Sequence, residues 1–457
     1  MTRVFERLKA FFQEVAKLFT KNDIQRIVGP QMVVTDKMLE QIGTWRAMLA
    51  GKADWVTDYV VSLRLERAIC REFANVAVLE MESSVTVPRL DAIYQKAIAD
   101  LREDLQDGLG LGSMILKPLG GSRVECVPAD RFVPLAFDDE GQLVKVCFIA
   151  QKRMADDDYY YRFETHDLQN GVLTITHRAF HSRTAGQLGS PCALQEVPEW
   201  ATLPETVSFA VDRPIFGFYK NPLPNDIDGS PCGVSVFEIA TELIKKADVQ
   251  FGRLEWEFES GERAVHVDVT ALEPRPVKDK DGKISYKTPK LNKRLYRAMD
   301  LQAGDGMDLF DVFSPEFRDA SIRAGLEEFK RSIEFNVGLA YGDLSTPAMV
   351  EKTASEVMTA RQRKYATVTA IQAKLEECLE GLVFGLAFMN GMVHSGYEFS
   401  CTFEDSILTD DAERRAIDRQ DVAMNVMTPL EYRMKWYGED EATAAAHLPA
   451  PEPDVIA

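Results

Sequence analysis

The hydrophobic and polar positions in the N-terminal half of the chain predict helices followed by strands. Apolar residues recur at three- and four-residue steps in 36–49, 62–82 and 88–106, which predicts three helices. Between residues 113 and 186 the pattern changes to short strand-like runs, SMILKPL, VECVP, VKVCFIA and YYYRFETHDL. Together these elements predict a domain of the α+β class.

A hairpin is predicted within this strand region. The run YYYRFETHDLQNGVLTITHRAF contains Asn170-Gly171, and both residue types tolerate the positive φ angles of a tight turn. Proline-rich residues 187–234 follow, with one more strand expected near 215–219.

Two long helical patterns then flank a small insert. The first is SVFEIATELIKKADVQFGRLEWEFES, which starts at Ser235 and would be about 39 Å long. The second starts at Ser314-Pro315-Glu316, which has the N-cap, first-position and first-turn residues of a helix start, and runs to Gly338. The insert contains Asp281-Gly282, a hairpin signal. The pattern predicts a pair of long helices with a separate, strand-containing tip.

The longest helical pattern begins at the stretch EKTASEV, residues 351–357. Thr353 and Glu356 have the spacing of a capping box, and apolar residues continue at helical steps to about residue 390, roughly 55 Å. The preceding stretch, LAYGDLSTPAMV, is rich in turn formers and predicts a loop.

Shorter elements are expected at the two ends of the chain. At the C-terminal end, 397–407 alternates like a strand, 410–426 is helical, and Thr428-Pro429-Leu430-Glu431 is a second capping box with Gly438 as the C-cap. The tail HLPAPEPDVIA is expected to be disordered. At the N-terminal end, 3–20 forms an apolar helical face that packs on its own protein or a neighbouring subunit, or lies on a membrane surface.

Charge changes this picture. The net charge is −19, so the chain as a whole should repel DNA. Residues 274–298 are the exception, with a local charge of +7 that leaves −26 for the rest. This predicted basic surface comprises nine residues: Arg275, Lys278, Lys280, Lys283, Lys287, Lys290, Lys293, Arg294 and Arg297.

The sequence contains no credible catalytic motif. The stretch DGLGLGS follows a predicted helix and precedes a strand, the reverse of a dinucleotide loop, so Gly108 is interpreted as a helix C-cap. His166, His177 and His181 are interpreted as exposed strand residues, not metal ligands. Seven scattered cysteines without a CxxC pair favour a reducing cytoplasm. We therefore expect no enzyme activity, no catalytic residues, no cofactor and no metal.

Several stretches carry a resemblance to a known family. They are MLEQIGTWRAMLAG, REFANVAVLEMES, LGLGSMILKPLGGSRVECVPADRFVPLAFDDEGQL, NPLPNDIDGSPCGVSVFEIA, EKTASEV and TPLEYRMKWYGEDEATA. In these stretches and in the order of its elements, the chain resembles the portal proteins of tailed bacteriophages, in the branch described as phage portal or minor capsid proteins. The resemblance covers most of the chain.

The resemblance implies a portal-type fold with named parts. They are an N-terminal amphipathic helix (1–21), an α/β wing (22–234, with 395–410 returning to it), a two-helix stem (235–261 and 315–338), a small β-containing clip (262–314), a tunnel loop (339–352), a long tunnel helix (353–394), a helical crown (411–450) and a disordered tail (451–457).

The resemblance also implies function and partners. The chain would form a ring of about twelve subunits at one capsid vertex of a virion, assembled in the bacterial cytoplasm. The ring would be the conduit for packaging and ejection of double-stranded DNA, without sequence specificity. Its other partners would be the terminase large subunit, head-completion or adaptor proteins, scaffold protein and major capsid protein.

Within the implied tunnel loop, small, polar and apolar residues predict contact with DNA by shape, and Lys352 is the expected phosphate contact. The DNA-facing residues would be Tyr341, Asp343, Leu344, Ser345, Thr346, Met349 and Lys352. Two other classes of function remain open: a membrane-associated helical scaffold anchored by residues 3–20, and a nucleotide-handling enzyme, although no phosphate-binding loop is present.

Overall fold

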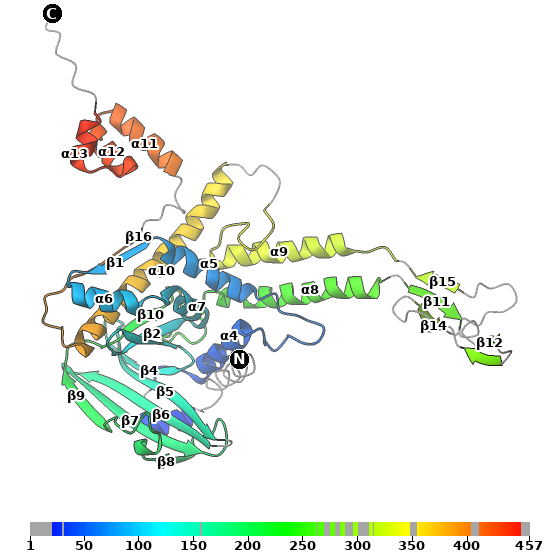
Figure 1. Ribbon diagram of the computed structural model, residues 1–457, viewed down its shortest axis with the longest axis horizontal. Helices are drawn as coiled ribbons and strands as arrows, with labels where there is room; N and C mark the ends of the chain where they lie inside the picture. Colours follow the sequence, from blue (N-terminus) through cyan, green and yellow to red (C-terminus); the bar gives the residue numbers. More distant parts are fainter. Residues whose placement is uncertain are drawn as a thin grey trace, which may run out of the picture.

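The computed structural model describes residues 21–29, 32–155, 158–262, 264–268, 275–278, 284–287, 296–299, 310–313, 315–347, 354–403 and 411–448. The chain has mixed α and β structure, as predicted. Figure 1 shows a body of sheets and helices from which two long helices extend as an arm. The expected helix at 3–20 and the tail 451–457 lie outside the described residues.

The largest sheet in the body is antiparallel and has six strands. Its order is β4-β5-β6-β7-β8, and β9 also pairs with β7. Its strands are β4 (Phe132–Phe137), β5 (Leu143–Ala155), β6 (Asp158–Gln169), β7 (Val172–Ser182), β8 (Ser190–Cys192) and β9 (Thr206–Ala210). The predicted hairpin is confirmed: Asn170 (φ 51°) and Gly171 (φ 74°) join β6 to β7.

Two smaller sheets complete the body. Strand β2 (Ser113–Gly120) lies between β3 (Arg123–Pro128) and β10 (Gly217–Lys220). Strand β1 (Met81–Val85) pairs antiparallel with β16 (Phe399–Phe403), from Met81 opposite Phe403 to Val85 opposite Phe399. The second pairing joins segments that are far apart in the sequence.

The helices of the body follow the predicted pattern with two corrections. They are α3 (Lys21–Val28), α4 (Asp36–Leu49), α5 (Leu65–Leu79), α6 (Pro88–Ala97) and α7 (Leu101–Leu111). The helix predicted at 62–82 ends before β1. The helix predicted at 88–106 is two helices, and the second continues past its predicted end.

The predicted C-cap at Gly108 is wrong. Gly108 lies inside α7, and the cap is Gly112, which has a φ of 89°. A Cβ at Gly108 would lie 2.9 Å from Met114 Sδ and 3.3 Å from Tyr219 Cδ1, so the position is glycine because α7 packs closely on the sheet. Tertiary packing therefore explains a glycine that local pattern assigned to a helix end.

Helix α10 (Ala354–Met389) is the longest helix and crosses the body, close to its predicted span. Its buried residues include Val368, Leu375 and Leu382. The backbones of α10 and β10 approach closely, because a Cβ on Gly217 would lie 2.1 Å from the Cys378 carbonyl oxygen. Helix α10 therefore packs on β10 and β2, and Figure 1 shows it running across the body.

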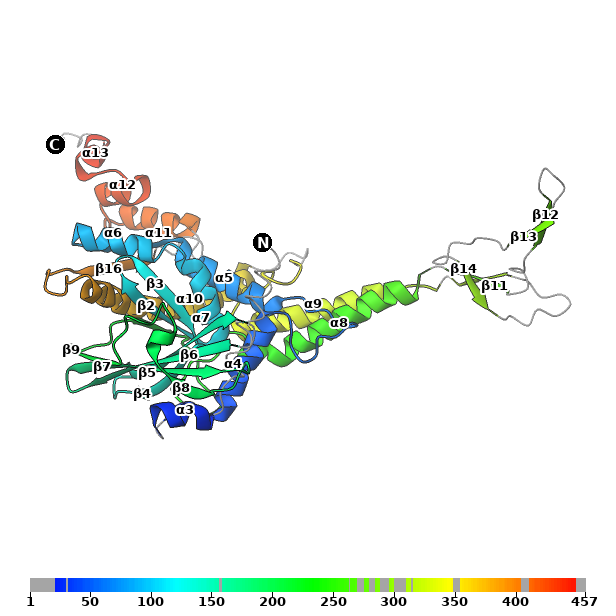
Figure 2. The same cartoon turned by 60° about the horizontal axis from the view of Figure 1, so that its bottom comes forward.

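The arm consists of α8 (Thr241–Ser260) and α9 (Asp319–Val337), which pack along each other (Figures 1 and 2). Both helices start later than predicted. A short 3-10 helix, Glu238–Ala240, precedes α8, and residues 315–318 before α9 have no regular structure.

A buried carboxylate explains the late start of α9. Glu257 on α8 accepts hydrogen bonds from the Arg318 backbone N–H at 2.8 Å and from the Arg318 side chain at 2.7 and 3.2 Å. Arg318 is the N-cap position of α9. A contact between the two helices therefore sets this boundary, whereas the predicted Ser314 cap lies outside the described residues.

The tip of the arm contains short strands. Strand β11 (Ala264–Asp268) pairs parallel with β14 (Tyr296–Met299) and antiparallel with β15 (Phe310–Phe313). Strands β12 (Arg275–Lys278) and β13 (Ile284–Lys287) form an antiparallel hairpin, as predicted. The predicted turn residues Asp281-Gly282 lie outside the described residues.

Three short helices end the described chain: α11 (Asp411–Ala423), α12 (Pro429–Tyr437) and α13 (Glu441–Ala446). The second predicted capping box is confirmed. Thr428 Oγ1 accepts from the Glu431 N–H at 3.1 Å, and Glu431 Oε2 accepts from the Thr428 N–H at 2.8 Å. Gly438 caps the other end with a φ of 64°. None of the helices in the described part of the chain is both long and apolar enough to cross a membrane.

Candidate functional site between the arm and the longest helix

The loop that follows α9 is the candidate site. Helix α9 ends at Gly338, whose φ of 86° favours glycine, and the Leu339 N–H donates to the Glu334 carbonyl oxygen at 2.9 Å. A Cβ at Gly338 would lie 2.4 Å from Thr367 Oγ1 on α10. The turn therefore needs glycine both for its backbone conformation and for its contact with α10.

The loop folds around the carboxylate of Glu334. Glu334 Oε1 accepts from the backbone N–H groups of Gly342 (3.1 Å), Leu344 (2.6 Å) and Ser345 (2.7 Å), and Oε2 accepts from the Ser345 hydroxyl at 2.9 Å. Glu334 is fully buried, with 0% of its surface exposed. Four hydrogen bonds therefore replace the water that this buried charge would otherwise require.

A second carboxylate holds the far end of the described loop. Glu327 Oε2 accepts from the Thr346 N–H at 2.6 Å, and Lys330 donates to Glu327 Oε1 at 3.0 Å. Burial alone would raise the pKa of Glu327, but the Thr346 N–H and Lys330 hold it below its usual value. Glu327, Lys330 and Glu334 lie on α9, so one helix carries both anchors.

Helix α10 holds the other side of the loop. Arg363 donates to the Leu339 carbonyl oxygen at 3.1 Å, and its guanidinium lies over the rings of Phe335 (4.8 Å) and Tyr341 (5.1 Å). Lys364 pairs with Asp343 at 3.1 Å and with Glu72 of α5 at 2.7 Å. Burial alone would lower the pKa of Lys364, but Glu72 and Asp343 raise it. The loop is thus tied to the body as well as to the arm.

The structure separates the residues predicted to face DNA into three groups. Tyr341 and Thr346 are exposed. Asp343, Leu344 and Ser345 are occupied by contacts within the chain, and Ser345 is only 5% exposed. Met349, Lys352 and the capping residue Thr353 lie outside the described residues, and Glu356 lies in α10 with its side chain undescribed.

Sequence reasoning missed the residues that shape this loop, Glu327, Glu334, Arg363 and Lys364. One signal was present. Glu334 lies four residues before the C-cap Gly338, where the helix dipole disfavours an acidic side chain. An acidic residue at that position indicates that donors from outside the helix satisfy it.

The basic tip is described only in part. Lys278 is exposed, and Arg275 lies directly opposite Lys287 in the β12–β13 hairpin. Arg297 lies in β14 opposite His266. The remaining predicted basic residues lie outside the described residues: Lys280, Lys283, Lys290, Lys293 and Arg294. The backbone register therefore pairs two basic positions across this hairpin.

The prediction that His166, His177 and His181 are exposed strand residues is wrong. His166 and His177 are buried, at 3% and 8% exposure, and His166 lies against the rings of Phe148 and Phe216. His181 is partly buried and contacts Asp158 at 3.0 Å. Alternation along β6 and β7 predicted the strands but not the side chains from neighbouring elements that cover this face.

His166 and His177 lie beside a buried carboxylate, Glu164. Lys117 Nζ lies 3.1 Å from both Glu164 oxygens, His166 Nε2 lies 2.8 Å from Oε1, and Arg162 donates to Oε2 at 3.2 Å. Burial would raise the pKa of Glu164, but Lys117, His166 and Arg162 hold it well below its usual value. Burial lowers the pKa of His177. The cluster joins β2 to β6 and engages both oxygens of Glu164. Three of its buried nitrogens, Arg162 Nε, His166 Nδ1 and His177 Nδ1, have no hydrogen-bond partner among the described residues.

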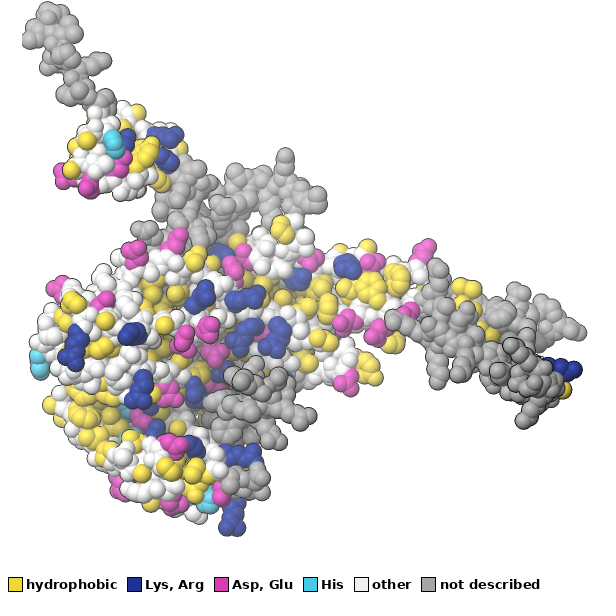
Figure 3. All heavy atoms as spheres, viewed as in Figure 1, with side chains coloured by type: hydrophobic (Ala, Val, Ile, Leu, Met, Phe, Trp, Pro, Cys, Tyr) yellow, Lys and Arg dark blue, Asp and Glu magenta, His cyan; other side chains and the backbone are white. Residues whose placement is uncertain are grey.

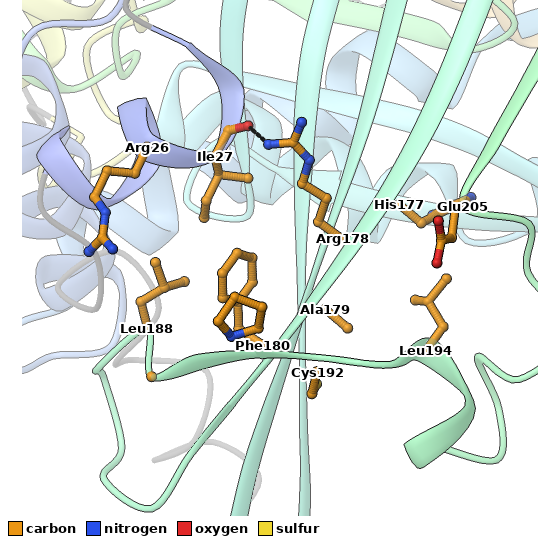
Figure 4. Close-up of a pocket in the computed structure, with 12 residues that line it drawn as sticks. Arg26, Ile27, His177, Arg178, Ala179, Phe180, Leu188, Cys192, Leu194 and Glu205 are labelled. Carbon is orange, nitrogen blue, oxygen red and sulfur yellow. Dashed lines mark hydrogen bonds between the residues drawn. The ribbon is translucent and has the colours of Figure 1, made fainter.

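A pocket of about 460 Å³ lies between α3 and the large sheet (Figure 4). Its walls include Phe180, Leu188 and Leu194, and the Arg178 guanidinium donates to the Ile27 carbonyl oxygen. His177 and Glu205 lie together at one side of it. Among the described residues, no group of three His, Cys, Asp or Glu side chains is placed to hold a metal ion.

Comparison with known proteins gives this chain no family. No protein-family model matches the sequence, and no curated protein matches it.

Proposed function

We propose that this chain is a portal protein of the tailed-bacteriophage type. About twelve copies would form a ring at one capsid vertex, closed by a single repeated interface. DNA would pass along the ring axis during packaging and ejection, and the chain would act as a conduit without enzyme activity of its own. The main support for this proposal is the loop after α9, which is anchored to α9 by Glu334 and to the body by Lys364.

The arm supports an assembly role because it exposes large hydrophobic side chains. Trp256 is 60% exposed, Phe335 55%, Phe317 48% and Phe258 40%. Figure 3 shows hydrophobic side chains gathered along the arm on the face drawn. Apolar surface of this kind is typical of protein–protein interfaces. A neighbouring copy packed along the arm would remove it from water.

The basic tip supports a docking role. Arg275 and Lys287 are register partners in the β12–β13 hairpin, so a partner with an acidic surface would complement the charge of this segment. A ring of about twelve tips would gather on the order of eighty positive charges before screening by salt. We propose that the terminase large subunit and later a head-completion or adaptor protein dock here.

The loop supports the passage of DNA by contact without strong attraction. Tyr341 and Thr346 are exposed residues of the loop. We no longer propose that Ser345 contacts DNA, because Ser345 is buried and its hydroxyl donates to Glu334. With a net charge of −19 per chain, a ring would hold phosphates weakly enough for DNA to slide.

Electron microscopy of the purified protein tests this proposal. Negative staining should show rings with a central hole. Trp256→Glu should weaken association between subunits by about 2 kcal/mol or more, because an exposed aromatic anchor is replaced by a charge. Its matched control is Glu259→Gln, an exposed position on the same helix. A wild-type protein that stays monomeric at high concentration, or a Trp256→Glu variant that forms rings as well as Glu259→Gln, contradicts the proposal.

A further inference from the structure

Two arginines in the C-terminal helices converge on one neutral oxygen. Arg415 and Arg419 lie one turn apart on α11, and each donates from Nε to the hydroxyl oxygen of Tyr432 on α12, at 3.1 and 3.0 Å. Neither guanidinium has a carboxylate partner within the described part of the chain. Two positive charges are therefore held side by side on one phenol oxygen.

The carboxylates nearby have other partners. Asp418 accepts from Trp436 Nε1 and pairs with Lys435, both at 2.7 Å. Glu439 binds Arg433 through two hydrogen bonds of 2.8 Å, and the Glu431 carboxylate caps α12. Among the described side chains, these three carboxylates are thus engaged away from the arginine pair.

Aromatic rings position one member of the pair. The Arg415 guanidinium lies 5.8 Å from the centre of the Trp436 ring and 5.2 Å from that of Tyr437. Arg419 is exposed, and Figure 3 shows basic side chains beside hydrophobic ones on these helices. A stacked guanidinium loses less conformational freedom when it binds an anion, so such a site is partly organised in advance.

We propose that Arg415 and Arg419 form a binding site for the phosphate groups of duplex DNA. Guanidinium groups bind phosphate through paired hydrogen bonds, and a phosphodiester offers a non-bridging oxygen to each arginine. The choice of DNA as the phosphate source rests on the proposed function, since a DNA conduit meets phosphodiesters continuously. This site lies in an acidic chain, so it would add a local point of contact rather than a general affinity.

The test measures binding of a short labelled duplex to the full-length protein over a series of salt concentrations. Replacing both arginines, Arg415→Gln with Arg419→Gln, should weaken binding about tenfold or more at low salt. It should also reduce the slope of log affinity against log salt by about one for each arginine that contacts DNA. Circular dichroism and thermal melting check that the variant folds.

Arg433→Gln is the matched control because it removes the same charge from the same helices. Its guanidinium is already bound by Glu439, so the salt dependence should stay at the wild-type value. Arg415→Lys with Arg419→Lys keeps the charge without the paired donors and should keep the slope while lowering affinity. Equal salt dependence in the double glutamine variant and Arg433→Gln overturns the inference.

Competitors identify the source of the anion. If polyglutamate displaces the duplex as well as unlabelled DNA does, the site binds an acidic protein. If inorganic phosphate does so at matched ionic strength, the site binds free phosphate. Either result overturns the inference. Electron micrographs of the same samples separate the two proposals. If the protein forms rings but the double glutamine variant binds DNA as the wild type does, only this inference is overturned. If the protein stays monomeric but its DNA binding depends on the two arginines, only the proposed ring is contradicted.

Discussion

Two buried carboxylates in this protein are satisfied in different ways. Glu164 in the large sheet is surrounded by the charged groups of Lys117 and Arg162 and by a histidine ring. Glu334 at the end of the arm accepts from three backbone N–H groups and one hydroxyl. Charged side chains join two sheets in the first case, whereas backbone donors shape a loop in the second. Glu164 therefore supports the body, whereas Glu334 sets the conformation of one segment.

The largest expected effect comes from Glu164→Gln. The change leaves Lys117 buried without its nearest counter-charge, which should lower the free energy of unfolding by about 3–5 kcal/mol. Chemical denaturation followed by circular dichroism measures this loss. Glu125→Gln is the control, since Glu125 lies 3.7 Å from Lys117 but its side chain is 39% exposed, so about 1 kcal/mol or less is expected. Equal losses in the two variants would contradict the role given to Glu164.

The pH dependence of this variant sharpens the same comparison. The folded pKa of Glu164 is lower than its usual value of 4.5, so its stabilisation is fully present above the unfolded pKa and is lost as pH falls through the folded pKa. The difference in unfolding free energy between wild type and Glu164→Gln should therefore be constant near neutral pH and shrink in acid. A difference that grows as pH falls below 4.5 would show that the carboxylate is not ionised in the folded protein.

A smaller and more local effect is expected from Glu334→Gln. The amide of glutamine keeps the shape but brings N–H groups against the loop donors, which should cost about 1–3 kcal/mol. Hydrogen exchange followed by mass spectrometry should show faster exchange at Gly342, Leu344 and Ser345, with little change in the large sheet. Glu328→Gln, an exposed change on the same helix, should leave these amides unaffected. Loss of protection throughout the molecule would mean that Glu334 supports the whole fold.

The smallest effect is expected from Glu327→Gln. Glu327 is partly exposed and binds one loop amide, so the expected cost is about 0.5–1 kcal/mol after allowance for screening by solvent. Faster exchange should be confined to Thr346. Because the folded pKa of Glu327 is lowered, this difference should be full near neutral pH and disappear as pH falls through that pKa. An effect equal to that of Glu334→Gln would remove the distinction between the two anchors.

Local pattern predicted most of the elements correctly. Asn170-Gly171 and the Thr428–Glu431 capping box determine structure within a few residues, and both predictions are confirmed. Predictions failed where a residue distant in the sequence determines the local structure. Gly108 is small because Met114 and Tyr219 pack on it, and α9 begins late because Glu257 binds Arg318. Such contacts are not visible in a single stretch of sequence.

The candidate site was predicted as a segment but not as a set of interactions. Turn-forming residues identified the loop, since they act locally. Its anchors depend on α9, α5 and α10 meeting in space, through Glu334, Glu72 and Lys364. The buried histidines were missed for the same reason, because alternation along β6 does not reveal what covers that face of the sheet.

The pairing of β1 with β16 also governs when this chain can finish folding. Strand β1 ends at Val85 and its partner spans Phe399–Phe403, so during synthesis β1 must wait for its partner until the ribosome has made residue 403. Contacts this distant in sequence form slowly, and an unpaired strand edge is open to chains on neighbouring ribosomes. The nascent protein should therefore depend on chaperones until β16 emerges, and truncation before that strand should yield aggregates rather than a smaller stable domain.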